Sequence, residues 1–170
     1  MPLETIEFKG NVYPAWQASG NSARFIRPFA EEVCIGNGVD VGANRMDWCF
    51  PGAFPIDPEL NQWDAYTFPE DKKELDYVIS HHCAEHLTHP YTAFNYWHSR
   101  LKSGGIILLY LPSFQNLYWR PWNKGNSPHL HQFTPEIIKA YFDDQPNMWK
   151  NTLVSGIDLN SSFCAISEKV

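Results

Sequence analysis

The sequence predicts an α/β domain in three layers, with a mostly parallel sheet covered by helices on both faces. Three observations support this fold class. Short apolar runs alternate with helical patterns, the longest run is apolar on both faces, and two further strand candidates close the chain. No repeat or linker divides the 170 residues, which suffice for one hydrophobic core, so we expect a single domain over residues 1–170.

The first predicted elements are a helix and two strands. Residues 23–33 carry apolar side chains at helical spacing, although Pro28 leaves the start of this helix open. Residues 38–43 form a short β-branched run that closes with Gly42, and residues 75–80 form a second strand candidate. Both runs are short enough for buried strands of a parallel sheet.

A strand–helix–strand unit occupies the middle of the chain. Residues 105–112 give a third strand, and apolar side chains recur at helical spacing in residues 91–102. Pro90 lies near the first turn of this helix, and Gly104-Gly105 provides a stop signal. Two strands joined through a helix run parallel, so the second and third strands are expected to be parallel.

The C-terminal part predicts a helix followed by a hairpin. The helix begins at Thr134-Pro135-Glu136, because threonine suits the N-cap, proline suits the first turn, and a carboxylate suits the positive end of the helix dipole. Strand candidates at residues 152–159 and 162–167 flank the turn Asn160-Ser161. A hairpin there adds an antiparallel edge to the sheet.

Charge and cysteine content narrow the class of protein. The chain has 13 Lys and Arg against 19 Asp and Glu, a formal charge of −6, which argues against long nucleic acids as partners. No signal peptide is evident, and the longest apolar run is too short to span a bilayer. The four cysteines contain no CxxC pair, which is typical of reduced thiols. We therefore expect a cytoplasmic protein without membrane insertion.

Aromatic residues make up 15% of the chain, and many lie in residues 113–133, directly after the third strand. This segment is expected to overhang the carboxyl end of the sheet, where loops form substrate pockets. For any single ring, packing on the sheet as part of a lid is the simpler interpretation. The candidates for walls of a substrate pocket are Trp16, Tyr118, Trp119 and Trp122.

Three aspartates lie in or after the predicted strands, in order along the chain. Asp40 lies in the run that closes with Gly42, Asp57 follows a short apolar run, and Asp64 precedes Ala65 in a loop. Open α/β sheets bind ligands at the carboxyl ends of their strands, where backbone N–H groups and a helix N-terminus are available. A carboxylate such as Asp57 can accept hydrogen bonds from both hydroxyls of a ribose.

Several motifs, taken together, resemble the class I S-adenosylmethionine-dependent methyltransferases, in particular their compact small-molecule branch. The resemblance covers residues from about 38 to about 133. It rests on Val39-Asp40-Val41-Gly42-Ala43-Asn44, Pro55-Ile56-Asp57, Asp64-Ala65-Tyr66-Thr67-Phe68-Pro69, His81-His82-Cys83-Ala84-Glu85-His86-Leu87 and Leu101-Lys102-Ser103-Gly104-Gly105. It implies a Rossmann-like sheet and transfer of a methyl group from S-adenosylmethionine to an oxygen or nitrogen of a small-molecule acceptor.

The resemblance also implies roles for individual residues. It places Asp40 and the turn Gly42, Ala43 and Asn44 along the methionine end of the cofactor, with His81 beside them. It places Asp57 on the ribose, and Asp64 and Ala65 at the edge of the adenine. Two histidines of the aromatic segment, His129 and His131, are the candidates for a catalytic base, because imidazole titrates near neutral pH.

Two other functions remain open at this stage. Asn44 and Met46 stand where this family usually has further glycines, which suggests a protein that binds S-adenosylmethionine with weak or no catalysis. His82-Cys83-Ala84-Glu85-His86 also matches the H-x-x-E-H string of zinc hydrolases, with a third ligand among His89, His98, His129 and His131. A short motif of this kind is weak evidence, so the sequence assigns no metal site. It indicates no particular oligomeric state.

Overall fold

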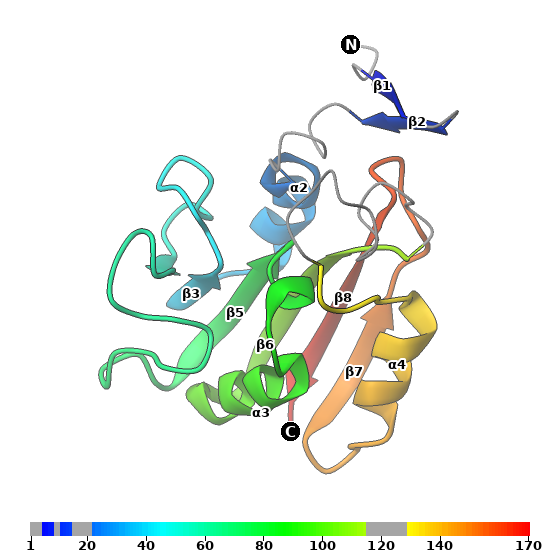
Figure 1. Cartoon of the computed structure of the whole chain (residues 1–170). Helices are drawn as coiled ribbons and strands as arrows, with labels where there is room; N and C mark the ends of the chain where they lie inside the picture. The colour runs from blue at the N-terminus through cyan, green and yellow to red at the C-terminus, as the bar shows by residue number, and fades with distance from the viewer. Residues whose placement is uncertain (1–4, 9–10, 15–21, 115–128) are drawn as a thin grey trace.

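The computed structural model describes residues 5–8, 11–14, 22–114 and 129–170, and its centre is a six-stranded sheet (Figure 1). The strand order is β4-β3-β5-β6-β8-β7. The strands are β3 (Gly38–Val41), β4 (Phe54–Ile56), β5 (Leu75–His81), β6 (Leu101–Pro112), β7 (Trp149–Val154) and β8 (Ser162–Lys169). Strands β4, β3, β5 and β6 are parallel, whereas β8 is antiparallel to both β6 and β7. The predicted fold class is therefore confirmed. A separate hairpin joins β1 (Thr5–Phe8) and β2 (Asn11–Pro14).

Helices cover both faces of the sheet. Helices α3 (Pro90–Arg100) and α4 (Pro135–Asp143) pack on the face that carries Val39, Val78 and Leu109, whereas α2 (Ala23–Val33) packs on the opposite face (Figure 1). A single turn of 3₁₀-helix, η1 (Ala84–His86), follows β5. In the described part of the chain, no helix has the length and apolar character that a membrane crossing requires.

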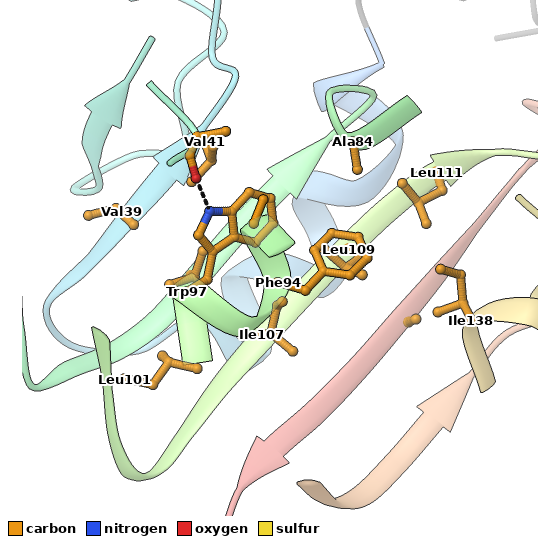
Figure 2. Close-up of a cluster of buried hydrophobic side chains, with 14 of the residues drawn as sticks. Val39, Val41, Ala84, Phe94, Trp97, Leu101, Ile107, Leu109, Leu111 and Ile138 are labelled. Carbon is orange, nitrogen blue, oxygen red and sulfur yellow. Dashed lines mark hydrogen bonds between the residues drawn. The ribbon is translucent and has the colours of Figure 1, made fainter. Parts of the chain in front are cut away.

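The larger hydrophobic cluster lies beneath α3. Figure 2 shows Phe94 and Trp97 of α3 over Leu109 and other apolar side chains of the sheet. Both aromatic side chains are fully buried. The indole N–H of Trp97 also donates a 2.7 Å hydrogen bond to the carbonyl of Ala65, so the core is tied directly to a loop at the carboxyl edge of the sheet.

Helix α4 begins as the sequence predicts. The side-chain oxygen of Thr134 accepts a 3.3 Å hydrogen bond from the backbone N–H of Ile137, and Pro135 takes the first helical position. Ile138 and Phe142 are buried against the sheet. Helix α2 also runs through Ala23–Val33 as expected, with Pro28 inside it.

Two predicted boundaries are wrong. Helix α3 ends at Arg100 rather than at residue 102, because buried Leu101 already pairs with Leu75 at the start of β6. Gly104, with φ of +77°, then allows the irregular start of that strand. Strand β6 is therefore longer than the predicted 105–112.

The first strand of the C-terminal hairpin is β7, which covers Trp149–Val154 rather than residues 152–159. Trp149 is buried, and the strand therefore begins three residues earlier in the chain than predicted. Asp158 accepts hydrogen bonds from the backbone N–H groups of Asn160 and Ser162, which forms a loop where the sequence predicts the end of a strand. The predicted hairpin exists, but its connection is longer than the two residues Asn160-Ser161.

Replacing Trp97 with phenylalanine is expected to lower the free energy of unfolding by about 1–3 kcal/mol, because the buried carbonyl of Ala65 loses its hydrogen-bond donor. Urea denaturation followed by circular dichroism measures this loss. Ser99→Ala is the matched control on the same helix, since the exposed Ser99 hydroxyl donates to the carbonyl of Tyr96 one turn away, and it should change stability by less than about 0.5 kcal/mol. Equal stability of the Trp97 variant and the wild type would contradict this role.

Candidate active site

A tight turn follows β3 at the carboxyl edge of the sheet. Gly42 has φ of +83°, and a Cβ atom built on it would lie 2.4 Å from the Cys83 side chain, so only glycine fits. Its N–H donates to the carbonyl of Ile56 at the end of β4. Asn44 adopts φ of +59°, a left-handed conformation that asparagine tolerates better than most residues. Asn44 therefore takes a backbone conformation that glycine adopts most readily.

Asp57 follows β4 and faces this turn. One carboxylate oxygen accepts a 2.7 Å hydrogen bond from the N–H of Asn44, and the other accepts one of 2.9 Å from the N–H of Glu59. The side chain is held in one orientation by these two bonds, and only 7% of the residue is exposed. Each carboxylate oxygen can accept a second hydrogen bond, so Asp57 can still receive two hydroxyl groups.

The turn Asp64–Thr67 lies near Asp57 at the same edge of the sheet, and its residues line the pocket described below. Asp64 accepts hydrogen bonds from the N–H of Tyr66 and the hydroxyl of Thr67, which closes the turn on itself. The carbonyl of Ala65 is held by Trp97, and the hydroxyl of Tyr66 accepts a bond from the N–H of His89. One hydrogen bond therefore fixes this turn to helix α3 and another fixes it to His89, the N-cap residue of that helix.

These segments surround a pocket of about 160 Å³. Its lining comprises Val41, Gly42, Ile56, Asp57, Pro58, Asp64, Ala65, Tyr66, Cys83 and Leu87. The pocket lies where the chain order of the sheet reverses, with β4 on one side of β3 and β5 on the other, which is the ligand-binding position of open α/β sheets. Its volume is below the roughly 300–1,000 Å³ of pockets that enclose a whole drug-sized ligand, so it suits one end of an extended ligand.

The structure brings together Gly42, Asp57, Asp64 and Ala65 of the predicted cofactor residues at this pocket. Asn44 reaches it through its bond to Asp57, whereas the Ala43 side chain is fully buried. The sequence analysis missed Tyr66, Cys83 and Leu87. Cys83 and Leu87 are apolar and four residues apart, the spacing of side chains on one face of a helical turn, and this spacing is the signal that could have indicated them.

Asp40 and His81 form a buried pair on the other face of the sheet. The Asp40 carboxylate accepts a 2.7 Å bond from the N–H of Phe50 and lies 3.2 Å from Nε2 of His81. Burial alone lowers the pKa of His81, but the negative charge of Asp40 and the hydrogen bond to it outweigh burial and raise that pKa above its ordinary value. His81 lines a separate hollow of about 10 Å³ with residues of α2, not the pocket that contains Asp57.

Three of the described thiols, those of Cys34, Cys49 and Cys83, are unsuited to nucleophilic catalysis. Burial raises the pKa of Cys34 and Cys49 to about 12, with the charge of Asp40 acting in the same direction. Burial also raises the pKa of Cys83, which lines the pocket. These side chains are protonated near neutral pH, whereas the thiolate is the reactive form.

A cluster of histidines surrounds the buried carboxylate of Glu85, which is 1% exposed. One of its oxygens lies 3.8 Å from Nδ1 of His82, 3.7 Å from Nε2 of His86 and 3.8 Å from Nε2 of His129. Burial raises the pKa of Glu85 to about 8. Burial and the nearby charge of His86 lower the pKa of His129 to about 3, and burial lowers that of His82 well below its usual range.

The H-x-x-E-H string does not form the helix that zinc hydrolases use for two histidine ligands. Only the single turn Ala84–His86 is helical, and His82 precedes it with φ of +48°. The atoms that approach one another within 4.8 Å come from Glu85, His86 and His129 instead. The glutamate is thus placed as a neighbour of the two imidazoles rather than as a base beside a pair of helical ligands.

The two candidate catalytic histidines lie beside η1. The backbone N–H groups of Leu130 and His131 both donate to the carbonyl of Glu85, at 2.8 and 3.1 Å. His129 is buried, and the His131 ring stacks on Phe133 with Nε2 buried and without a hydrogen-bond partner among the described residues. The predicted substrate residues Trp16, Tyr118, Trp119 and Trp122 lie outside the described residues.

Comparison with known proteins agrees with this geometry. A family model described as a methyltransferase domain matches residues 18–109, more than half of the chain. Among curated proteins the search finds no match. A SAM-dependent methyltransferase from Archaeoglobus fulgidus is similar in structure, with a TM-score of 0.61, 15% identity, and coverage of 91% of this chain and 98% of that one.

Two further solved structures are similar. A SAM-dependent methyltransferase from Thermotoga maritima has a TM-score of 0.62, 13% identity, and coverage of 92% and 93%. The N-methyltransferase NodS from Bradyrhizobium japonicum, solved with S-adenosyl-L-homocysteine, has a TM-score of 0.60, 12% identity, and coverage of 92% and 91%. At these identities the likeness concerns the fold.

The sheet order, with a pocket at its switch point, is that of a Rossmann-like fold, and the family match identifies the chain as a methyltransferase domain. The chain belongs to the methyltransferase domain family.

Proposed function

We propose that this enzyme transfers the methyl group of S-adenosylmethionine to an oxygen or nitrogen atom of a small-molecule acceptor. The observation that carries the proposal is the pocket at the carboxyl ends of β3 and β4, with Asp57 fixed at its edge. The acidic balance of the chain supports a small acceptor rather than a long nucleic acid. All four cysteines are free thiols, which supports a cytoplasmic location.

The residues of the pocket fit the cofactor. Asp57 accepts the two ribose hydroxyls on the lone pairs that Asn44 and Glu59 leave open. The turn with Asp64 and Ala65 meets the adenine edge, and the turn at Gly42, which also lines the pocket, meets the methionine end. When bound, the cofactor supplies an electrophilic methyl group on its sulfonium.

The chain contributes alignment of the acceptor with that methyl group, which can supply roughly 7–11 kcal/mol of the barrier reduction. An acceptor hydroxyl with a high pKa also needs a base. Of the two predicted candidates, His131 suits this role better, because the low pKa of His129 makes it a weak proton acceptor near neutral pH. Full turnover by His131→Ala with an identified acceptor would remove this role.

The function is tested by two measurements on the purified chain. Titration calorimetry with S-adenosylhomocysteine is expected to give one binding site per chain. Incubation with S-adenosylmethionine and a panel of small hydroxyl and amine acceptors is expected to release S-adenosylhomocysteine. Incubation with S-adenosylmethionine and bulk RNA is expected to release none. The absence of binding heat would contradict the cofactor pocket. Binding without turnover on any acceptor would favour the alternative suggested by Asn44 and Met46, a binding protein without catalysis.

A further inference from the structure

The Glu85 carboxylate is unusual because the fold buries it without satisfying it. The residue is 1% exposed, and neither carboxylate oxygen has a hydrogen-bond partner among the described residues. Leaving a buried polar group unpaired costs about 1–3 kcal/mol, and a charged group costs more. Glu85 is not among the residues that line the cofactor pocket, although Cys83 and Leu87, two residues away on either side of it in the chain, are. A buried carboxylate of this kind calls for a positively charged partner.

Two imidazole nitrogens face this carboxylate at the separation of metal ligands. Nε2 of His86 and Nε2 of His129 lie 3.7 and 3.8 Å from the same Glu85 oxygen. These separations exceed the length of a hydrogen bond. Ligands about 2.1 Å from a tetrahedral ion lie about 3.4 Å apart, so an ion placed between the three groups needs only a small contraction. One ligand atom from each residue lies within 4.8 Å of the other two.

Backbone hydrogen bonds and ring contacts hold these three residues together. The N–H groups of Leu130 and His131 donate to the carbonyl of Glu85, so the segment with His129 is fixed against η1. The rings of His86 and His129 are edge to face, with centroids 4.6 Å apart. His82 completes the surroundings, with Nε2 2.8 Å from the Ser162 hydroxyl and Nδ1 facing Glu85. The site is therefore built before an ion arrives.

We propose that Glu85, His86 and His129 bind a divalent transition-metal ion, with Zn²⁺ as the ion that suits them best. Two neutral imidazoles and one carboxylate suit Zn²⁺ and its neighbours, whereas Mg²⁺ and Ca²⁺ require mostly oxygen ligands. Three protein ligands leave one position of a tetrahedral ion for a water molecule or another oxygen ligand. In this site Glu85 is a ligand, which differs from the H-x-x-E-H arrangement in which the glutamate acts as base.

The ion site adjoins the cofactor pocket. Cys83 and Leu87, on either side of Glu85 and His86 in the chain, both line the pocket, so a single short segment separates the two sites. Metal binding by these residues does not depend on the cofactor, and it goes beyond the proposed methyl transfer.

The full-length chain, stripped of metal with a chelator, is titrated with ZnCl₂ by calorimetry in the absence of S-adenosylmethionine. We expect one Zn²⁺ per chain and a rise in the melting temperature with Zn²⁺, and neither effect with MgCl₂. Loading with Co²⁺ is expected to produce visible ligand-field absorption. His86→Ala is the first variant, because His86 is partly exposed and its loss should leave the fold intact. Its Zn²⁺ affinity is expected to fall at least about 100-fold.

Glu85→Gln and His129→Asn test the two buried ligands, with circular dichroism to show that each variant is folded. His89→Asn is the matched control, since this exposed histidine lies just beyond η1 and outside the cluster, and its affinity should stay within about twofold. A wild-type chain that binds no Zn²⁺, or a folded His86→Ala variant with wild-type affinity, would overturn the proposal. Equal loss in His89→Asn would do the same. Calorimetry with S-adenosylhomocysteine on the same samples reports on the cofactor pocket separately.

Discussion

Replacing Asp57 with alanine is expected to lower the affinity for S-adenosylhomocysteine by roughly 100-fold or more. A hydrogen bond to a charged group contributes about 1.5–3 kcal/mol, and this carboxylate is proposed to accept two from the ribose. The loss is enlarged because Asp57 also holds the turn after β3 through the N–H of Asn44. Titration calorimetry on the wild type and on the variant measures the ratio of the two dissociation constants.

Two further variants separate the proposed contact of Asp57 with the ribose from its role in positioning the turn after β3. Asp57→Asn keeps an oxygen acceptor for the backbone but loses the charge, so it should fall between the wild type and Asp57→Ala. Asp47→Asn is the matched control, because Asp47 lies in the loop after the same turn, is exposed, and pairs only with Arg45 among the described residues. It should bind like the wild type. A folded Asp57→Ala chain with unchanged affinity would contradict the assigned ribose contact.

The order of the strands could be predicted in part from the sequence. The apolar runs locate β3, β5 and β6, because buried parallel strands need apolar side chains on both faces. The position of β8 between β6 and β7 could not be read from local pattern, since it depends on which long-range pairing buries Phe163. Burial of Leu101 and Trp149 likewise shifted two boundaries that local stop signals placed elsewhere.

The pocket was more accessible to prediction than the histidine cluster. Gly42, Asp57, Asp64 and Ala65 follow strands that end at one edge of the sheet, so topology brings them together. The approach of His129 to Glu85 depends on two backbone hydrogen bonds between distant segments, which have no local signal.

The strand period predicts the face of the sheet on which His81 lies. Side chains alternate between the faces of a strand, and Tyr77 and Ile79 of β5 pack on the α2 side whereas Val78 packs on the α3 side. His81 continues the first series and therefore lies with Asp40, on the α2 side.

Replacing Asp40 with alanine is expected to destabilise the fold by about 3–5 kcal/mol at acidic pH, because it leaves the fully buried His81 without its counter-charge. In the wild type, Asp40 raises the pKa of His81, so the pair contributes stability that is fully present below the unfolded-state pKa of histidine. This contribution is lost as the pH rises through the folded-state value. Without Asp40, burial and the charge of Arg27 lower that pKa, and protonation of His81 opposes folding.

The destabilisation should therefore be largest at about pH 5.5 and smallest at about pH 9, on either side of the ordinary histidine pKa. At the higher pH the remaining cost is the unpaired N–H of Phe50, about 1–3 kcal/mol. Urea denaturation at both values measures the difference. The double variant Asp40→Asn with His81→Asn removes both charges and should have little dependence on pH in this range. A destabilisation by Asp40→Ala that is equal at both pH values would show that the pair does not hold a protonated His81, and that Asp40 acts only as an acceptor for Phe50.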